Sequence, residues 1–144
     1  MKMNPVVHFE MPLEDKERVS KFYSKVFGWE IKVMGEEYGG YVLAMTTPSD
    51  DNGPLKPGAI NGGFFQKDPS KKDQYPHIVI SVDDIAEAMK KVTEAGGKVL
   101  GGSYKAGEPD DIPGVGLYVS FIDSEGNHVG MLQPTEMAQD DKAA

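Results

Sequence analysis

Three histidines and one nearby glutamate carry most of the chemistry that this sequence offers. His8, His77 and His128 are its only imidazoles, and Glu10 follows His8 by two residues. Imidazole and carboxylate groups can ligate a divalent metal ion or move protons near neutral pH. The chain has no cysteine, which excludes disulfides, thiolate nucleophiles and iron–sulfur clusters. Any metal or acid–base site must therefore draw on very few residues.

Two of the histidines lie in predicted strands, residues 6–11 and 77–82, each followed by an amphipathic helix. Asp15 and Asp84 are the predicted N-caps, and glycines predict the two helix ends, Gly28 and Gly96-Gly97. His8 and Asp15 recur as His77 and Asp84 at one offset of 69 residues, which indicates an internal duplication. Further strands are expected at residues 29–34, 38–46, 59–65, 98–100, 116–123 and 128–133, with loops at 47–58, 67–75 and 103–115.

The length of 144 residues fits one domain, 1–144, with a substantial core. We expect a first module at residues 5–66, a linker at 67–75, a second module at 76–134 and a disordered tail at 135–144. Residues 124–127 (SEGN) predict a hairpin turn.

Side chains of a strand alternate between the two faces of its sheet, so each strand can be divided by parity. One face is apolar and is expected to pack on the helices: Val7, Phe9, Met11, Ile60, Phe64, Ile78, Ile80, Val82, Leu117, Val119, Phe121, Val129 and Met131. The other face carries all three histidines with polar groups, glycines and some apolar residues, which suits a small-molecule pocket better than a solvated surface. Its members are His8, Glu10, Asn61, Gly63, Phe65, His77, Val79, Ser81, Tyr118, Ser120, His128, Gly130 and Leu132. Five of them are the predicted substrate contacts: Asn61, Phe65, Tyr118, Ser120 and His128.

The formal net charge is −8, and no stripe of lysine or arginine is present, which argues against nucleic-acid binding. The sequence has no run of 18 apolar residues and no signal-peptide pattern at its start. We therefore expect no membrane association and a cytoplasmic location.

Several segments resemble one protein family. VVHFE and KFYSKVFGWE are similar to the first module of vicinal-oxygen-chelate proteins, the glyoxalase/bleomycin-resistance/dioxygenase superfamily. YPHIVISVDD, EAGGKV and FIDSEGNHVGMLQP are similar to its second module. The resemblance spans residues 5–134 and is strongest to the uncharacterised glyoxalase-related branch. It implies an α+β fold in which two tandem βαβββ modules pair to form a curled mixed sheet around a cavity. The helices then lie on the outside, a small molecule is the ligand, and the protein is a homodimer.

The resemblance also implies a metal site. Metal-dependent members hold one divalent ion with four ligands from the first and last strands of each module, commonly His, Glu, His and Glu. Here His8 and His77 match the histidines, whereas the carboxylate positions, each 53 residues further on, read Asn61 and Gly130. We expect one ion (Zn, Ni, Fe or Mn) on His8 and His77, or none, with Glu10 as the catalytic residue.

A cluster of His8, Glu10, His77 and His128 would replace the missing carboxylates by a His₃Glu or a two-histidine-one-carboxylate set. Alternatively, His8 and Glu10 form an acid–base pair without metal.

Three functions stay open. The first is a metal-dependent lyase, isomerase or dioxygenase that acts on a small oxygen-bearing substrate. The second is a metal-free protein that binds a small molecule or sequesters a drug. The third is a non-enzymatic scaffold, with a cavity filled by its own side chains. Function belongs to the site, so the fold does not choose among them.

Overall fold

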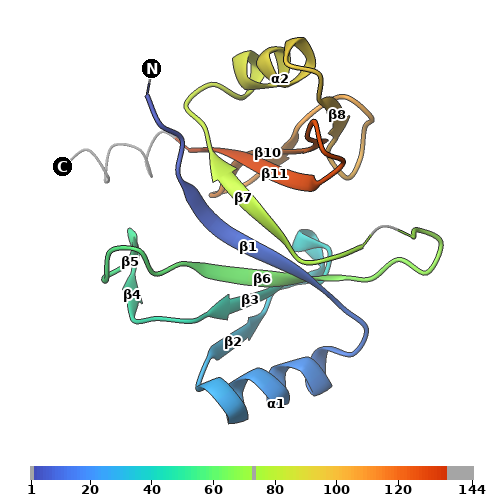
Figure 1. Cartoon of the computed structure of the whole chain (residues 1–144). Coiled ribbons are helices and arrows are strands. Elements are labelled where there is room, and N and C mark those ends of the chain that lie inside the picture. Colours follow the sequence, from blue (N-terminus) through green and yellow to red (C-terminus); the bar gives the residue numbers. More distant parts are fainter. Residues whose placement is uncertain (1, 73, 136–144) are drawn as a thin grey trace. The chain divides into compact units, whose positions relative to one another are not determined.

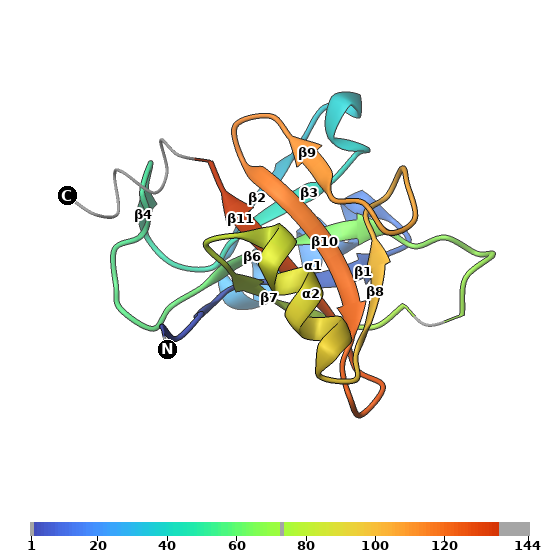
Figure 2. The same ribbon diagram turned by 90° about the horizontal axis from the view of Figure 1, so that it is seen from above.

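The computed structural model describes residues 2–72 and 74–135. The chain divides into two compact units, one formed by His8–His77 and the other by the residues up to Val7 together with those from Ile78 onward. Each unit contains one α-helix that packs on strands of the same unit (Figures 1 and 2).

The His8–His77 unit carries the first helix. Its strands have the order β2-β3-β6-β1, and β1 and β6 are parallel whereas the other pairs are antiparallel. A buried cluster of Leu13, Val42, Ala44 and Phe64 lies on the face that α1 covers. The elements are β1 (Val6–Leu13), α1 (Lys16–Phe27), β2 (Glu30–Val33), the 3₁₀ helix η1 (Glu36–Tyr38), β3 (Val42–Met45) and β6 (Asn61–Gln66).

The other unit repeats this plan around α2. The strand order is β7-β11-β10-β8, in which β7 and β11 are parallel, and β9 pairs with β10. Val82, Ile85, Val119 and Met131 form its buried cluster. The elements are β7 (His77–Ser81), α2 (Ile85–Glu94), β8 (Lys98–Gly101), β9 (Asp110–Ile112), β10 (Gly116–Ile122) and β11 (His128–Pro134).

Both helices begin where the sequence predicts. The Asp15 carboxylate accepts a hydrogen bond from the Arg18 backbone N–H at 3.0 Å, and the Asp84 carboxylate accepts one from the Glu87 N–H at 3.1 Å. Each bond satisfies a backbone donor that has no partner within its helix. Gly28 ends α1 in the left-handed conformation at φ 71°, which glycine adopts without strain.

The structure confirms the predicted α+β class and its two βαβββ modules. The face assignment also holds, because Phe9, Met11, Ile80 and Phe121 pack on the two buried clusters. Ile78 is an exception: this residue is 43% exposed at the start of β7, before the part of the strand that joins the core.

Two of the predicted loops were wrong, because short strands occur within them. Residues 47–58 contain the hairpin of β4 (Ser49–Asp50) and β5 (Gly53–Pro54), and residues 103–115 contain β9. The predicted tail lies outside the described residues from position 136 onward. In the described part of the chain, neither helix has the length and apolar character needed to cross a bilayer.

Candidate active site

The polar face of the His8–His77 unit lies opposite its buried cluster. The parallel register of β1 and β6 pairs His8 with Asn61 and Glu10 with Gly63. These residues alternate along their strands with Phe9 and Phe64, which pack in the core. The polar side chains therefore share one face of the sheet, as the sequence predicts.

Glu10 and His77 form a largely buried ion pair on this face. The Nε2 atom of His77 lies 3.1 Å from Oε1 of Glu10, and their side chains are only 6% and 13% exposed. The Nδ1 atom of His77 lies 3.3 Å from the Tyr75 carbonyl oxygen, and the Phe65 ring packs against the imidazole with centroids 5.7 Å apart. A proton on both ring nitrogens satisfies both of these hydrogen bonds.

Burial is the largest single influence on the His77 pKa and lowers it. The hydrogen bond and the negative charge of Glu10, together with the Tyr75 carbonyl, outweigh burial and raise the pKa above its ordinary value of 6.5. Glu10 therefore favours the charged form of His77.

The pKa of His8 is shifted in the opposite direction. Burial lowers the pKa of His8; the charge of Glu10 opposes this effect and His77 adds to it. The imidazole is consequently neutral near pH 7. Its Nε2 atom lies 3.0 Å from the hydroxyl of Tyr41, in the segment just before β3. The two imidazoles on this face thus have pKa values that are shifted in opposite directions.

A glycine makes room for Tyr41. A Cβ atom on Gly63 would overlap the Tyr41 ring and hydroxyl, so the ring lies directly over that glycine. Gly63 is also the register partner of Glu10 in the pairing of β1 with β6. The same glycine therefore neighbours both Tyr41 and Glu10. The tyrosine–glycine pair recurs in the other unit, where Tyr118 lies over Gly130. Sequence reasoning missed Tyr41, and the only signal for it was this repeated pair.

The amide of Asn61 is directed toward a neighbouring loop. Its oxygen accepts a hydrogen bond from the Thr46 backbone N–H at 2.9 Å, and its nitrogen donates to the Ser49 hydroxyl at 2.9 Å. Asn61 therefore fixes the start of the loop that contains β4. The structure brings together His8, Glu10, Phe65 and His77 of the predicted residues, but it gives the Asn61 side chain these other partners.

The remaining predicted residues belong to the other unit. Tyr118 lies over Gly130, the Ser120 hydroxyl donates to the Gly101 carbonyl at 3.2 Å, and His128 is half-buried at the start of β11.

The strand register corrects one alignment of the two modules. Gly63 pairs with Glu10, whereas Gly130 pairs with Val79, which is the repeat equivalent of Glu10 at the offset of 69. Gly130 is therefore equivalent to Gly63, and its assignment to the position of Asn61 was wrong. The equivalent of Asn61 is position 128, which is a histidine. The equal spacing of 53 residues, from His8 to Asn61 and from His77 to Gly130, therefore does not mark equivalent positions in the two modules.

The donor atoms as arranged do not fit a divalent metal ion. Each Nε2 atom that would face the ion already binds a protein atom, Tyr41 Oη for His8 and Glu10 Oε1 for His77. The Asn61 amide faces its loop, and a third neutral donor would add no charge to hold the ion. Across residues 2–72 and 74–135, no group of three or more His, Asp or Glu side chains is placed to hold a metal.

Comparison with known proteins identifies relatives over nearly the whole chain. Residues 6–131 match the model of the family described as "Glyoxalase/Bleomycin resistance protein/Dioxygenase superfamily". A glyoxylase-like domain-containing protein of Didymella fabae is 31% identical over 82% of this chain and 84% of its own. An ethylmalonyl-CoA/methylmalonyl-CoA epimerase of Cereibacter sphaeroides is 31% identical over 71% of this chain and 75% of its own.

One further relative is longer than this chain, and one solved structure is similar to it in fold. A probable chloroplastic lactoylglutathione lyase of Arabidopsis thaliana is 26% identical over 85% of this chain, which spans only 33% of the lyase. The crystal structure of a methylmalonyl-CoA epimerase from Mycobacterium tuberculosis shares the fold, with a TM-score of 0.63 and 12% identity over 96% of this chain and 91% of its own.

Proposed function

The chain belongs to the glyoxalase/bleomycin-resistance/dioxygenase superfamily, and from this premise we propose that it is a lyase- or isomerase-type enzyme. Its reaction is proton transfer at a carbon next to a carbonyl group of a small substrate. Neither the family nor the fold selects this reaction, so the proposal rests on the polar face of the His8–His77 unit.

One observation carries the proposal. Two imidazoles share this face and bind different groups, and their surroundings move their pKa values apart, lowering that of His8 and raising that of His77. Such separation of neighbouring titratable groups is typical of acid–base sites. Each imidazole also orients a second group, since His77 binds the Glu10 carboxylate and His8 binds the Tyr41 hydroxyl.

These pairs assign roles in the reaction. Glu10 is the base: its carboxylate takes the proton as the carbon–hydrogen bond breaks, and the bonding electrons move to the carbonyl oxygen to form an enolate. In the tautomer with its proton on Nε2, neutral His8 donates to Tyr41 Oη. The Tyr41 hydroxyl is then directed at the enolate oxygen, where a donor stabilises the developing charge. Return of the proton from Glu10 restores the carboxylate, and its delivery to the other face of the enolate carbon, or to the neighbouring carbon, gives the isomeric product.

The names of two relatives agree with this reaction class. One is an epimerase of acyl-CoA thioesters and another is a probable lactoylglutathione lyase. Methylmalonyl-CoA and lactoylglutathione both carry a hydrogen on the carbon beside a thioester carbonyl. We propose a substrate of this kind, with Phe65 beside it and with Asn61, Tyr118, Ser120 and His128 as the predicted contacts that remain to be tested.

Metal dependence is the competing proposal, in which His8 and His77 are ligands of a divalent ion and the enzyme is a metal-dependent lyase or dioxygenase. It requires both imidazoles to leave their present partners, Tyr41 and Glu10. We further propose that the protein acts in the cytoplasm as a homodimer.

Hydrogen–deuterium exchange tests the proton transfer without knowledge of the natural product. The purified chain is incubated in D₂O with methylmalonyl-CoA or S-lactoylglutathione, and loss of the α-proton signal is followed by ¹H NMR. We expect catalysed exchange that Glu10→Gln and Tyr41→Phe each reduce by about 100-fold, the usual size of a general-base or oxyanion contribution. Glu94→Gln, an exposed carboxylate of α2, is the matched control and leaves the rate unchanged.

Two results would contradict the proposal. Exchange that disappears on chelation and returns with Zn, Ni, Fe or Mn would establish the metal-dependent alternative. A raised melting temperature with these compounds but no exchange would indicate binding without catalysis, since a ligand of the folded state alone must stabilise it.

A further inference from the structure

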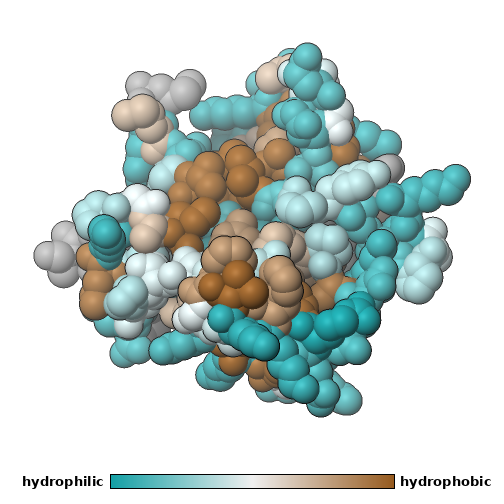
Figure 3. Space-filling view, turned by 60° about the horizontal axis from the view of Figure 1, so that its bottom comes forward, coloured by the Kyte–Doolittle hydropathy of each residue, from teal (hydrophilic) through white to brown (hydrophobic). Residues whose placement is uncertain are grey.

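The end of α1 carries an apolar surface cluster, defined here as Phe22, Val26 and Phe27. These side chains are 54%, 56% and 60% exposed. The cluster is held in place from below, because the Phe22 and Phe27 rings lie 5.1 and 5.9 Å from the ring of Tyr23. Figure 3 turns this side of the molecule forward and shows hydrophobic surface among hydrophilic side chains. Scattered exposed apolar residues are ordinary, but a contiguous group commonly marks an interaction surface.

The second module shows that the fold does not require this cluster. At the offset of 69 residues, Phe22, Val26 and Phe27 correspond to Lys91, Ala95 and Gly96. α2 packs on its sheet in the same way with polar or small residues at these positions. The three apolar side chains of α1 therefore have a role that α2 lacks.

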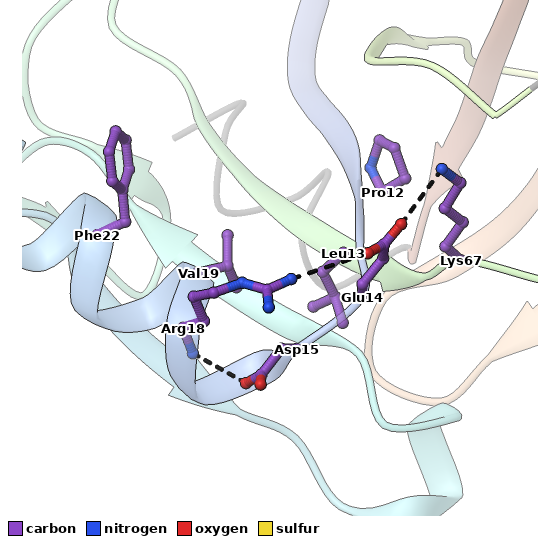
Figure 4. A pocket seen from close by; sticks show the side chains of 8 residues that line it. All are labelled: Pro12, Leu13, Glu14, Asp15, Arg18, Val19, Phe22 and Lys67. Carbon is purple, nitrogen blue, oxygen red and sulfur yellow. Dashed lines mark hydrogen bonds and ion pairs between the residues drawn. The ribbon is translucent and has the colours of Figure 1, made fainter.

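A hollow lies at the opposite end of the same helix. It has a volume of about 420 Å³ and is open to solvent, and Phe22 forms part of its lining (Figure 4). Its other apolar lining residues are Pro12, Leu13 and Val19. The surface along α1 thus combines the exposed rings of Phe22 and Phe27 with a hollow. If two copies of the chain met about a two-fold axis across α1, the rings of each copy would face the hollow of the other.

The charges along α1 select the direction of such a contact. Residues 14–18 contain three carboxylates and two cations, whereas residues 19–27 contain two lysines and no carboxylate. Antiparallel helices would therefore place Glu14 and Glu17 of one copy near Lys25 and Lys21 of the other. Parallel helices would bring like charges together.

We propose that a second copy of this chain docks on the apolar surface cluster, with the two α1 helices antiparallel about a two-fold axis. This inference rests on the homodimer of the proposed function and names its interface. In an isologous contact each residue acts twice, so single substitutions have doubled effects.

Sedimentation velocity of the full chain between about 1 and 100 µM tests the interface. We expect a dimer whose dissociation constant rises by at least about ten-fold in Phe22→Lys and in Val26→Lys, since a central apolar anchor commonly contributes that much. Lys91→Glu, at the equivalent position of α2, is the control and leaves the constant unchanged. Circular dichroism verifies that each variant is folded.

Charge reversal tests the antiparallel direction. Glu14→Lys and Lys25→Glu are each expected to weaken the dimer, and the double variant is expected to restore it. A chain that stays monomeric at 100 µM would refute the homodimer itself. A dimer that tolerates both Phe22→Lys and Val26→Lys would leave the homodimer standing but overturn this interface, and failure of the double variant to recover would overturn the antiparallel arrangement.

Discussion

Replacement of Glu10 by glutamine removes the negative charge beside His77 and keeps the shape of the side chain. The amide oxygen can still accept the His77 Nε2–H at the position of Oε1, 3.1 Å away. The substitution therefore converts a charge-assisted hydrogen bond, which contributes about 1.5–3 kcal/mol, into a neutral one that contributes about 0.5–1.5 kcal/mol. Because both side chains are nearly buried, solvent screens little of this difference. We expect a loss of about 1–1.5 kcal/mol in the free energy of unfolding.

The loss of unfolding free energy in Glu10→Gln must depend on pH. The pKa of His77 is raised in the folded protein above 6.5, so the stabilisation by Glu10 is complete below pH 6.5. It disappears as the pH rises through the folded-state pKa, where His77 loses its proton. Urea denaturation of the native chain and Glu10→Gln at about pH 6 and pH 9 measures this, with Glu94→Gln as the control. An equal destabilisation at both pH values would refute the ion pair, because the charge of Glu10 should stabilise the fold only where His77 is protonated.

Three further predictions concern other parts of the structure. Gly63→Ala displaces the Tyr41 ring and is expected to reduce deuterium exchange by about 100-fold, whereas Gly130→Ala, its equivalent in the other unit, has a much smaller effect; equal rates in both variants would show that the glycine has no role in the site. The pKa of His8 is lowered, so the folded state gains stability above pH 6.5 relative to lower pH; His8→Gln should flatten this fall of unfolding free energy below pH 6.5, as urea titrations can verify. Asp84→Ala removes the N-cap of α2 and is expected to cost about 1 kcal/mol in thermal unfolding, whereas Asp84→Asn should cost much less.

Much of the fold could be predicted because its signals are local. Asp15 and Asp84 precede apolar stripes with helical spacing, and each caps its helix through a bond to a residue three positions on. The alternation of polar and apolar residues likewise placed His8 and Glu10 on one face without knowledge of their partners. Because each module repeats these signals independently, the pattern in one module supports the interpretation of the other.

The parts that failed depend on contacts between distant residues. The register of β11 on β7 differs from that of β6 on β1 by two residues, and sequence spacing cannot show where loops have absorbed that difference. The strand β9 lies in a segment rich in glycine, proline and aspartate that is typical of a loop. It is stabilised by Asp110, whose carboxylate accepts the backbone N–H of Ser103 seven residues earlier. The role of Tyr41 depends on a glycine in another strand, which no local pattern predicts.

The two modules share their scaffold but differ at the position that matters for chemistry. Each places a tyrosine over a glycine of its last strand, and the register partner of that glycine is Glu10 in the first module and Val79 in the second. Val79 is only 2% exposed, so a second carboxylate there would be buried, and it would need a cation of its own. In the first module Glu10 is paired with His77, which corresponds to His8 at the offset of 69 residues. The repeat thus holds two equivalent imidazoles, but burial lowers the pKa of His8, whereas the carboxylate beside only one copy of the glycine raises the pKa of His77.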